Sequence, residues 1–252
     1  METIKQRAEM IGKNNDRHGA MIAGLEQVYV QLHAMDFAGV LKLLEPAFPK
    51  LAPLPMVHRD WLVWAGSAET GLGNHERALA HLLRCRAEMD EHALMSDWYN
   101  RMPLQLAITE ARLSKGDLEK ARLEAEQFLK VTLETEERTY RALAYEVNGR
   151  VAIAEQDLGG AQDFIGKAIE SMEGFEVPLA HWRVHSTAAE LHRTLGNRDL
   201  AERHREASCT TIMKLADSMP ADEPLRQTFL SAQLVRTVLG DWEASPLPAK
   251  EA

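Results

Sequence analysis

The chain has 252 residues, enough for one large hydrophobic core or for a stack of about five or six helix pairs. Its formal net charge of −9 argues against a nucleic-acid partner, because proteins that bind phosphate backbones normally present a basic surface. Only 6% of the residues are aromatic, whereas Ala, Leu and Glu are plentiful, and this composition favours helices.

Apolar residues at helical spacing predict a long helix over residues 3–33, with a break near Gly12 to Gly19 as an alternative. Its second part carries an apolar stripe made of Ile22, Leu25, Val28, Tyr29 and Leu32. Asp36 is expected to cap a short helix that runs to Phe48. Prolines 46, 49, 53 and 55 then end this helix, because proline restricts its own backbone and that of the preceding residue.

Four helix pairs follow, each joined by a short turn that makes the two helices antiparallel neighbours. They are expected at 57–72 with 75–92, 97–114 with 117–133, 137–155 with 158–172, and 178–195 with 198–218. Asp222 then caps a short helix that ends at Leu239 and covers the fourth pair with Phe229, Leu230, Val235 and Val238. The expected domains are 1–56 (N-terminal helices and a degenerate first repeat), 57–219 (four pairs), 220–240 (capping helix) and 241–252 (flexible tail).

The turns inside the pairs repeat a pattern of Gly, then Asp or Asn, then Ala early in the next helix. Its marker alanines, at 78, 121, 161 and 201, are separated by 43, 40 and 40 residues. A left-handed Gly can end one helix and the Asp or Asn can cap the next. The third copy has Gln156 in place of Gly, which predicts a looser turn or a bend shifted by one residue. A degenerate copy spans 35–40. A period of this length indicates a helical solenoid.

These residues resemble the tetratricopeptide repeat family. Gly66, Gly149 and Ala189 match its small residue midway along the first helix, Thr109 departs from it, and the four marker alanines match its second helix. The long period resembles the extended repeats in the helical regions of bacterial signalling ATPases and transcription activators. The resemblance implies an all-α, right-handed α-solenoid of antiparallel pairs.

Six charged residues on the first helices of successive pairs are the candidate partner-binding groove: Glu110, Glu146, Arg150, Arg183, Glu190 and Arg193. Their distances before each turn place them on one side of those helices. They could grip a peptide or polar ligand through charge-assisted hydrogen bonds. The alternative is that they pair with one another across repeats and only keep the surface hydrated.

Other clusters are open to a structural interpretation. His181 and His185, four residues apart on one helix, are a weak metal candidate, with His192 nearby; solvated or capping histidines are the alternative. Trp61, Trp64, Trp98 and Trp182, near the starts of first helices, are expected to pack between repeats. Cys85 and Cys209 are too few for a disulfide framework and are expected to be buried thiols in a reducing compartment.

The leading hypothesis is a non-enzymatic scaffold that binds a protein or peptide in bacterial regulation, with no cofactor. A small-molecule or peptide-sensing module and a metal-dependent enzyme subunit are the alternatives, and a homodimer through the N-terminal helices is left open. Residues 1–13 lack the apolar core of a signal peptide, and no run approaches the ~18 apolar residues that cross a bilayer. We therefore expect a cytoplasmic protein with no membrane partner.

Overall fold

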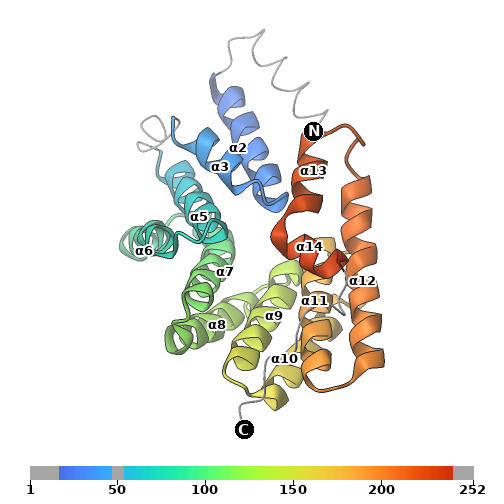
Figure 1. Cartoon of the computed structure of the whole chain (residues 1–252). Helices are drawn as coiled ribbons and strands as arrows, with labels where there is room; N and C mark the ends of the chain where they lie inside the picture. The colour runs from blue at the N-terminus through green and yellow to red at the C-terminus, as the bar shows by residue number, and fades with distance from the viewer. Residues whose placement is uncertain (1–16, 47–53, 241–252) are drawn as a thin grey trace. The chain divides into compact units, whose positions relative to one another are not determined.

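The computed structural model describes residues 17–46 and 54–240, with side chains from Gly24 onward. All regular structure in this part of the chain is α-helical, as predicted (Figure 1). The helices are α2 (Arg17–His33), α3 (Phe37–Leu44), α5 (Pro55–Gly71), α6 (His75–Glu91), α7 (Asp97–Lys115), α8 (Leu118–Leu133), α9 (Arg138–Ala154), α10 (Leu158–Met172), α11 (Pro178–Thr194), α12 (Arg198–Asp217), α13 (Pro224–Ser231) and α14 (Gln233–Leu239). None of these helices combines the length and the apolar character that a membrane crossing requires.

The helices follow one another in antiparallel pairs whose bounds lie close to the predicted ranges. Helix α5 contacts α6, α9 contacts both α8 and α10, and α11 contacts α12. The predicted C-terminal helix is wrong in one respect, because Ala232 adopts an extended backbone (φ −58°, ψ 135°) and divides it into α13 and α14. Helix α14 contacts α12 and buries Val235 and Val238. Residues 1–16 and 241–252, where the start of the first helix and the tail were predicted, lie outside the described residues. The helix predicted to run to Phe48 is shorter, because α3 ends at Leu44.

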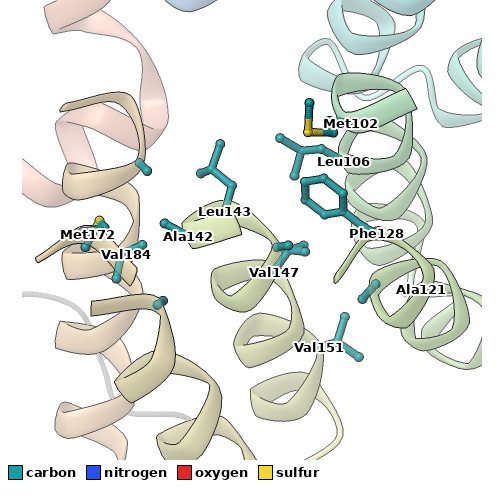
Figure 2. Close-up of a cluster of buried hydrophobic side chains, with 14 residues drawn as sticks. Met102, Leu106, Ala121, Phe128, Ala142, Leu143, Val147, Val151, Met172 and Val184 are labelled. Atoms are coloured by element: carbon teal, nitrogen blue, oxygen red, sulfur yellow. The ribbon is translucent and has the colours of Figure 1, made fainter. Parts of the chain in front are cut away.

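Contacts group the described residues into two compact units. One unit holds the residues up to Asn100 together with Met219–Phe229, and the other holds Arg101–Ser218 together with the residues from Leu230 onward. The second unit contains the helices that carry the candidate charged residues. Its core is continuous over five helices, α7 to α11. Figure 2 shows Phe128 of α8 beside Leu106 of α7, with Val147 of α9 facing them.

A left-handed residue followed by an Asp or Asn ends α2, α5, α7, α9 and α11 in the same way. In each turn the left-handed residue donates its N–H to the carbonyl three residues earlier, and the next residue donates to the carbonyl five residues earlier. At α7, for example, Gly116 donates to Leu113 and Asp117 to Arg112, both at 3.0 Å. This pattern of two hydrogen bonds is the Schellman motif, which satisfies the last carbonyls of a helix.

The two copies without glycine form the same turn, so the predicted looser bend at Gln156 is wrong. Gln156 has φ 63° and donates to Ile153 at 3.0 Å, and Asp157 donates to Ala152 at 2.9 Å. In the degenerate first copy, Met35 has φ 59° and makes the equivalent bond to Leu32. A residue with a Cβ is strained in this region. The turn geometry is therefore kept where the sequence loses the residue that suits it.

The predicted side-chain caps are confirmed at two of the five turns. Asp36 accepts from Gly39 N–H at 3.0 Å, and Asp157 accepts from Gly160 N–H at 2.9 Å. Asn74, Asp117 and Asn197 make no such bond at their helix starts. Two of these side chains are engaged elsewhere: Asn74 donates to the Glu69 carboxylate, and Asp117 lies 3.1 Å from the Arg112 guanidinium. Competition from a charged partner overrides the local cap.

Small residues let the two helices of a pair approach closely, as predicted. A Cβ placed on Gly66 of α5 would lie 2.4 Å from Leu82 Cγ of α6, and one on Gly149 of α9 would lie 2.8 Å from Ile165 of α10. The marker alanines opposite are almost fully buried, at 0% exposure for Ala78, Ala121 and Ala161 and 2% for Ala201. Each pair is thus held at a spacing that its side chains set.

A buried arginine fastens the end of α6 in the first unit. Arg59 of α5 donates from Nη1 to both carboxylate oxygens of Asp97 at 2.7 Å. Its Nη2 donates to the carbonyl of Glu88, in the last turn of α6, and to that of His92, which follows the helix. The guanidinium therefore pairs with a carboxylate while it also donates to two carbonyls near the C-terminal end of α6.

Replacing Gln156 with glycine should stabilise the protein by about 1 kcal/mol, because glycine adopts φ 63° without the Cβ penalty. The matched control, Gln162→Gly at an exposed position inside α10, should destabilise by about 1 kcal/mol. Urea denaturation of both variants measures the two free energies of unfolding. Equal destabilisation of the two variants would show that position 156 is not left-handed in solution.

Replacing Gly66 with alanine should lower the free energy of unfolding by about 1–3 kcal/mol, because the added methyl overlaps Leu82 Cγ in the α5–α6 contact. Gly166→Ala in α10 is the control, since nothing lies within 4 Å of a Cβ there. That variant should gain up to ~1 kcal/mol from helix propensity. Thermal melting of the two variants compares them, and a neutral or stabilising Gly66→Ala would contradict the close approach.

Candidate functional site

Four of the six predicted groove residues meet in the second unit. Glu110 lies on α7, Glu146 and Arg150 on α9, and Arg183 on α11. Glu110 precedes the left-handed Gly116 by six residues, and Arg150 precedes the left-handed Gln156 by six, so the two residues occupy equivalent places in successive pairs. The repeated turn therefore brings side chains that are 40 residues apart to the same side of neighbouring first helices. We call this set of four the charge network.

The Glu110 carboxylate is the centre of the charge network. Its Oε1 accepts from Arg150 Nη1 at 3.4 Å and also from Arg183 Nη2. Glu146 joins from below the surface, with Oε2 3.8 Å from Arg183 Nη2 and Oε1 3.8 Å from Arg150 Nε. Thr187 of α11 donates to Glu146 Oε1 at 2.7 Å. The network thus ties three first helices together through two carboxylates and two guanidinium groups.

Burial and pairing act against each other on the charges of the network. Burial acts to raise the pKa of Glu110, but Arg183 and Arg150 outweigh it and hold the pKa of that carboxyl below its usual 4.5. The contribution of Glu110 to stability is therefore present above pH 4.5 and is lost as the pH falls through the lowered value. Burial likewise acts to lower the pKa of Arg183, and the carboxylates of Glu110 and Glu146 raise it above its usual value. Glu110 and Arg183 therefore hold each other in the ionised form at neutral pH.

The network is neutral overall but leaves hydrogen-bond donors unused. The side chains of Arg150 and Arg183 are 31% and 20% exposed, that of Glu110 is 26% exposed, and that of Glu146 is 2% exposed. A guanidinium has five N–H donors. Within the described residues each arginine donates one hydrogen bond, to Glu110. Further N–H donors on both arginines remain for other oxygen acceptors.

The other two predicted groove residues lie further along α11. Glu190 has an exposed side chain, and its carbonyl accepts from the Thr194 hydroxyl at 3.0 Å. Arg193 is half-buried near the end of the helix. Two residues that the sequence analysis missed belong to these clusters. Thr187 could have been found from its spacing of four residues after Arg183, whereas His204 reaches its partner only through the packing of α12 on α11.

The two predicted metal candidates, His181 and His185, lie side by side on α11. The rings of His181 and His185 have centroids 4.3 Å apart on α11. Their δ nitrogens are engaged by Thr211 and by His204 of α12, at 2.9 and 2.8 Å. In residues 17–46 and 54–240, no three His, Cys, Asp or Glu side chains are grouped as ligands of a metal ion.

The tryptophans and cysteines divide between core and surface. Trp61 and Trp182 are buried, as expected, and Trp61 Nε1 donates to the Leu44 carbonyl at 2.9 Å. Trp64 is half-buried. The packing prediction is wrong for Trp98, which is 62% exposed because the neighbouring Asp97 takes the buried position at the start of α7. Both cysteines are free; Cys85 is buried as expected, whereas Cys209 is only half-buried.

Removing the shared carboxylate of the network should destabilise the second unit. We expect Glu110→Ala to lower the free energy of unfolding by about 2 kcal/mol, below the 3–5 kcal/mol of a fully buried pair because Glu110 is partly exposed. The control is Glu176→Ala, which removes an exposed partner of Lys214 and should leave stability unchanged. Chemical denaturation measures the free energies of unfolding of the two variants. Equal values would mean that the network contributes no more to stability than an exposed ion pair.

Comparison of the chain with models of known protein families gave no match, and comparison with curated proteins gave none.

Proposed function

We propose that this protein is a non-enzymatic scaffold of the tetratricopeptide type, in which helix pairs stack as a right-handed α-solenoid and bind a segment of a partner protein in bacterial regulation. Three features support the proposal: the same left-handed turn in five places, the antiparallel pairs, and the close approach at Gly66 and Gly149. Repeats of this kind present a rigid row of helices on which surface side chains select a partner.

The charge network on α7, α9 and α11 is the main support for the proposed binding surface. Its two arginines are held in place by Glu110, so binding a partner costs little further side-chain ordering. Their remaining N–H groups can donate hydrogen bonds to oxygen atoms of a partner. A helix surface with pre-ordered, partly exposed guanidinium groups is suited to recognition rather than to acid–base chemistry.

The neutral balance of the network indicates which partner chemistry fits it. A carboxylate brought to Arg150 or Arg183 would also meet Glu110 and Glu146, whose negative charges oppose it. A backbone carbonyl carries no net charge and can accept from the same N–H groups. The proposal therefore specifies an extended peptide segment whose main-chain carbonyls are bound by the two arginines.

Affinity capture from the native lysate tests the proposal with paired charge reversals. The variant Arg150→Glu/Arg183→Glu should lose the captured partner, with a dissociation constant weakened at least tenfold, or about 1.4 kcal/mol. The control Arg122→Glu/Arg203→Glu makes the same charge change on α8 and α12 and should capture as well as wild type. The milder Arg150→Gln removes one partly exposed guanidinium and gives a second reading if the double reversal does not fold.

Unchanged capture by a folded double reversal would overturn the proposed surface. The competing small-molecule sensor makes a different prediction in a thermal-shift screen. A metabolite that stabilises wild type but not Arg150→Gln, with no protein captured, would replace the partner-binding proposal. Circular dichroism of every variant establishes that binding is compared between folded proteins.

A further inference from the structure

Four of the ten histidines of the chain lie in a row between α11 and α12. His181, His185 and His192 belong to α11 and His204 to α12. The ring centroids of His181 and His185 are 4.3 Å apart, those of His185 and His204 5.1 Å, and those of His192 and His204 5.4 Å, the last two rings being parallel within 3°. We call this set the histidine row.

The two central rings face each other through the same atom. His185 Nδ1 and His204 Nδ1 are 2.8 Å apart, which is a hydrogen-bond distance. One of the two nitrogens must carry the hydrogen and the other must accept it, so the contact uses one neutral acceptor ring. If both rings are fully protonated, two N–H groups point at each other and the hydrogen bond is lost. The α11–α12 contact therefore includes an interaction that depends on the protonation of histidine.

Burial and neighbouring histidines lower the pKa values in the histidine row. Burial lowers the pKa of His185 to about 4, with His181 and His204 adding to the shift. Burial also lowers the pKa of His204, with a contribution from His192, and burial alone lowers the pKa of His181 and His192. Within the described residues, no acidic group stabilises the protonated form of any of the four.

The charged groups on the neighbouring helices are engaged elsewhere or are exposed. On α9, Glu146 and Arg150 belong to the charge network, and on α12 Arg205 pairs with Glu202. The titratable side chains of α10 (Asp163, Lys167 and Glu170), Arg203 and Glu206 of α12 and Arg236 of α14 are exposed, and Lys214 of α12 reaches Glu176. Arg193, on α11 beside His192, would repel a protonated ring rather than stabilise it.

We propose that the histidine row is an acid-sensitive contact, in which protonation loosens the packing of α11 against α12. Helix α11 also carries Arg183, so loosening it changes the position of an arginine of the charge network. This acid-sensitive contact needs no partner, and the proposal does not depend on whether the charge network binds one. A regulatory function follows for acidified conditions, in which the second unit would lose its order at the last helix pair first.

The pH window follows from the direction of the shifts. Each histidine has a lower pKa in the folded protein than its usual 6.5, so the unfolded chain binds more protons below that pH. The stabilisation is fully present above pH 6.5 and is lost as the pH falls toward about 4. For His185 alone, linkage gives a rise of about 30-fold in the unfolding equilibrium constant between pH 7.5 and pH 5.

Urea denaturation at pH 7.5 and pH 5 tests the proposal on the full chain. His185→Asn/His204→Asn keeps an amide at the position of each Nδ1 but cannot titrate. Between pH 7.5 and pH 5, we expect the unfolding equilibrium constant of wild type to rise at least 30-fold more than that of this variant. His92→Asn, at a side chain 77% exposed, is the control and should follow wild type. Parallel pH dependence of wild type and the double variant would overturn the proposal.

NMR titration of the imidazole nitrogens in wild type gives a second reading that needs no variant. The proposal expects the pKa of His185 to lie near 4 and that of His204 to lie below the usual 6.5. It also expects amide exchange, corrected for its intrinsic pH dependence, to accelerate in α11 and α12 before α8 and α9. Ordinary titration of His185 and His204, or uniform loss of protection, would contradict it.

Discussion

The left-handed turn that ends the first helix of each pair is the constraint on which the rest of this structure depends. It closes a helix with two fixed backbone hydrogen bonds and points the chain into an antiparallel second helix. The turn occurs at Met35, Gly73, Gly116, Gln156 and Gly196, with φ between 59° and 80°. Two of these residues pay a conformational cost that glycine avoids, so the surrounding packing must favour the turn strongly enough to impose it.

The same turn sets the place of the charged residues. Because Glu110 and Arg150 stand at equal distances before their turns, they reach the same side of α7 and α9. Arg183 and Thr187 then complete the network from α11. The opposite requirement acts on α11 at the surface facing α12, where the half-buried histidine row has its pKa values lowered by burial. Helix α11 thus contributes to the charge network, where opposite charges pair, and to the histidine row, where burial disfavours the protonated rings.

Local sequence rules predicted much of this arrangement and failed where tertiary contacts compete with them. Helix ranges follow from periodicity, and the small residues at Gly66 and Gly149 were expected from the resemblance to the repeat family; the structure confirms both. The caps at Asn74 and Asp117 failed because charged neighbours engage those side chains. No proline or glycine stands at the break at Ala232, so the apolar periodicity predicted one continuous helix there.

The candidate site shows the same division. Equal spacing before the turns predicted that Glu110 and Arg150 share a surface. The contact of Arg183 with Glu110 spans 73 residues and needs the packing of three helices, and His204 enters the histidine row only through the α11–α12 contact. Residues on different helices meet according to rotations that no single helix pattern contains.

The backbone angle φ at Gln156 and Met35 tests the central claim most directly. It can be measured by NMR from the three-bond HN–Hα coupling together with the intraresidue HN–Hα cross-peak, with Ala78 and Ala161 as helical references. The account predicts positive φ at both residues, near 63° and 59°, and therefore a strong intraresidue cross-peak. A negative φ at either residue would contradict the claim that one left-handed turn recurs through the chain whatever residue occupies it.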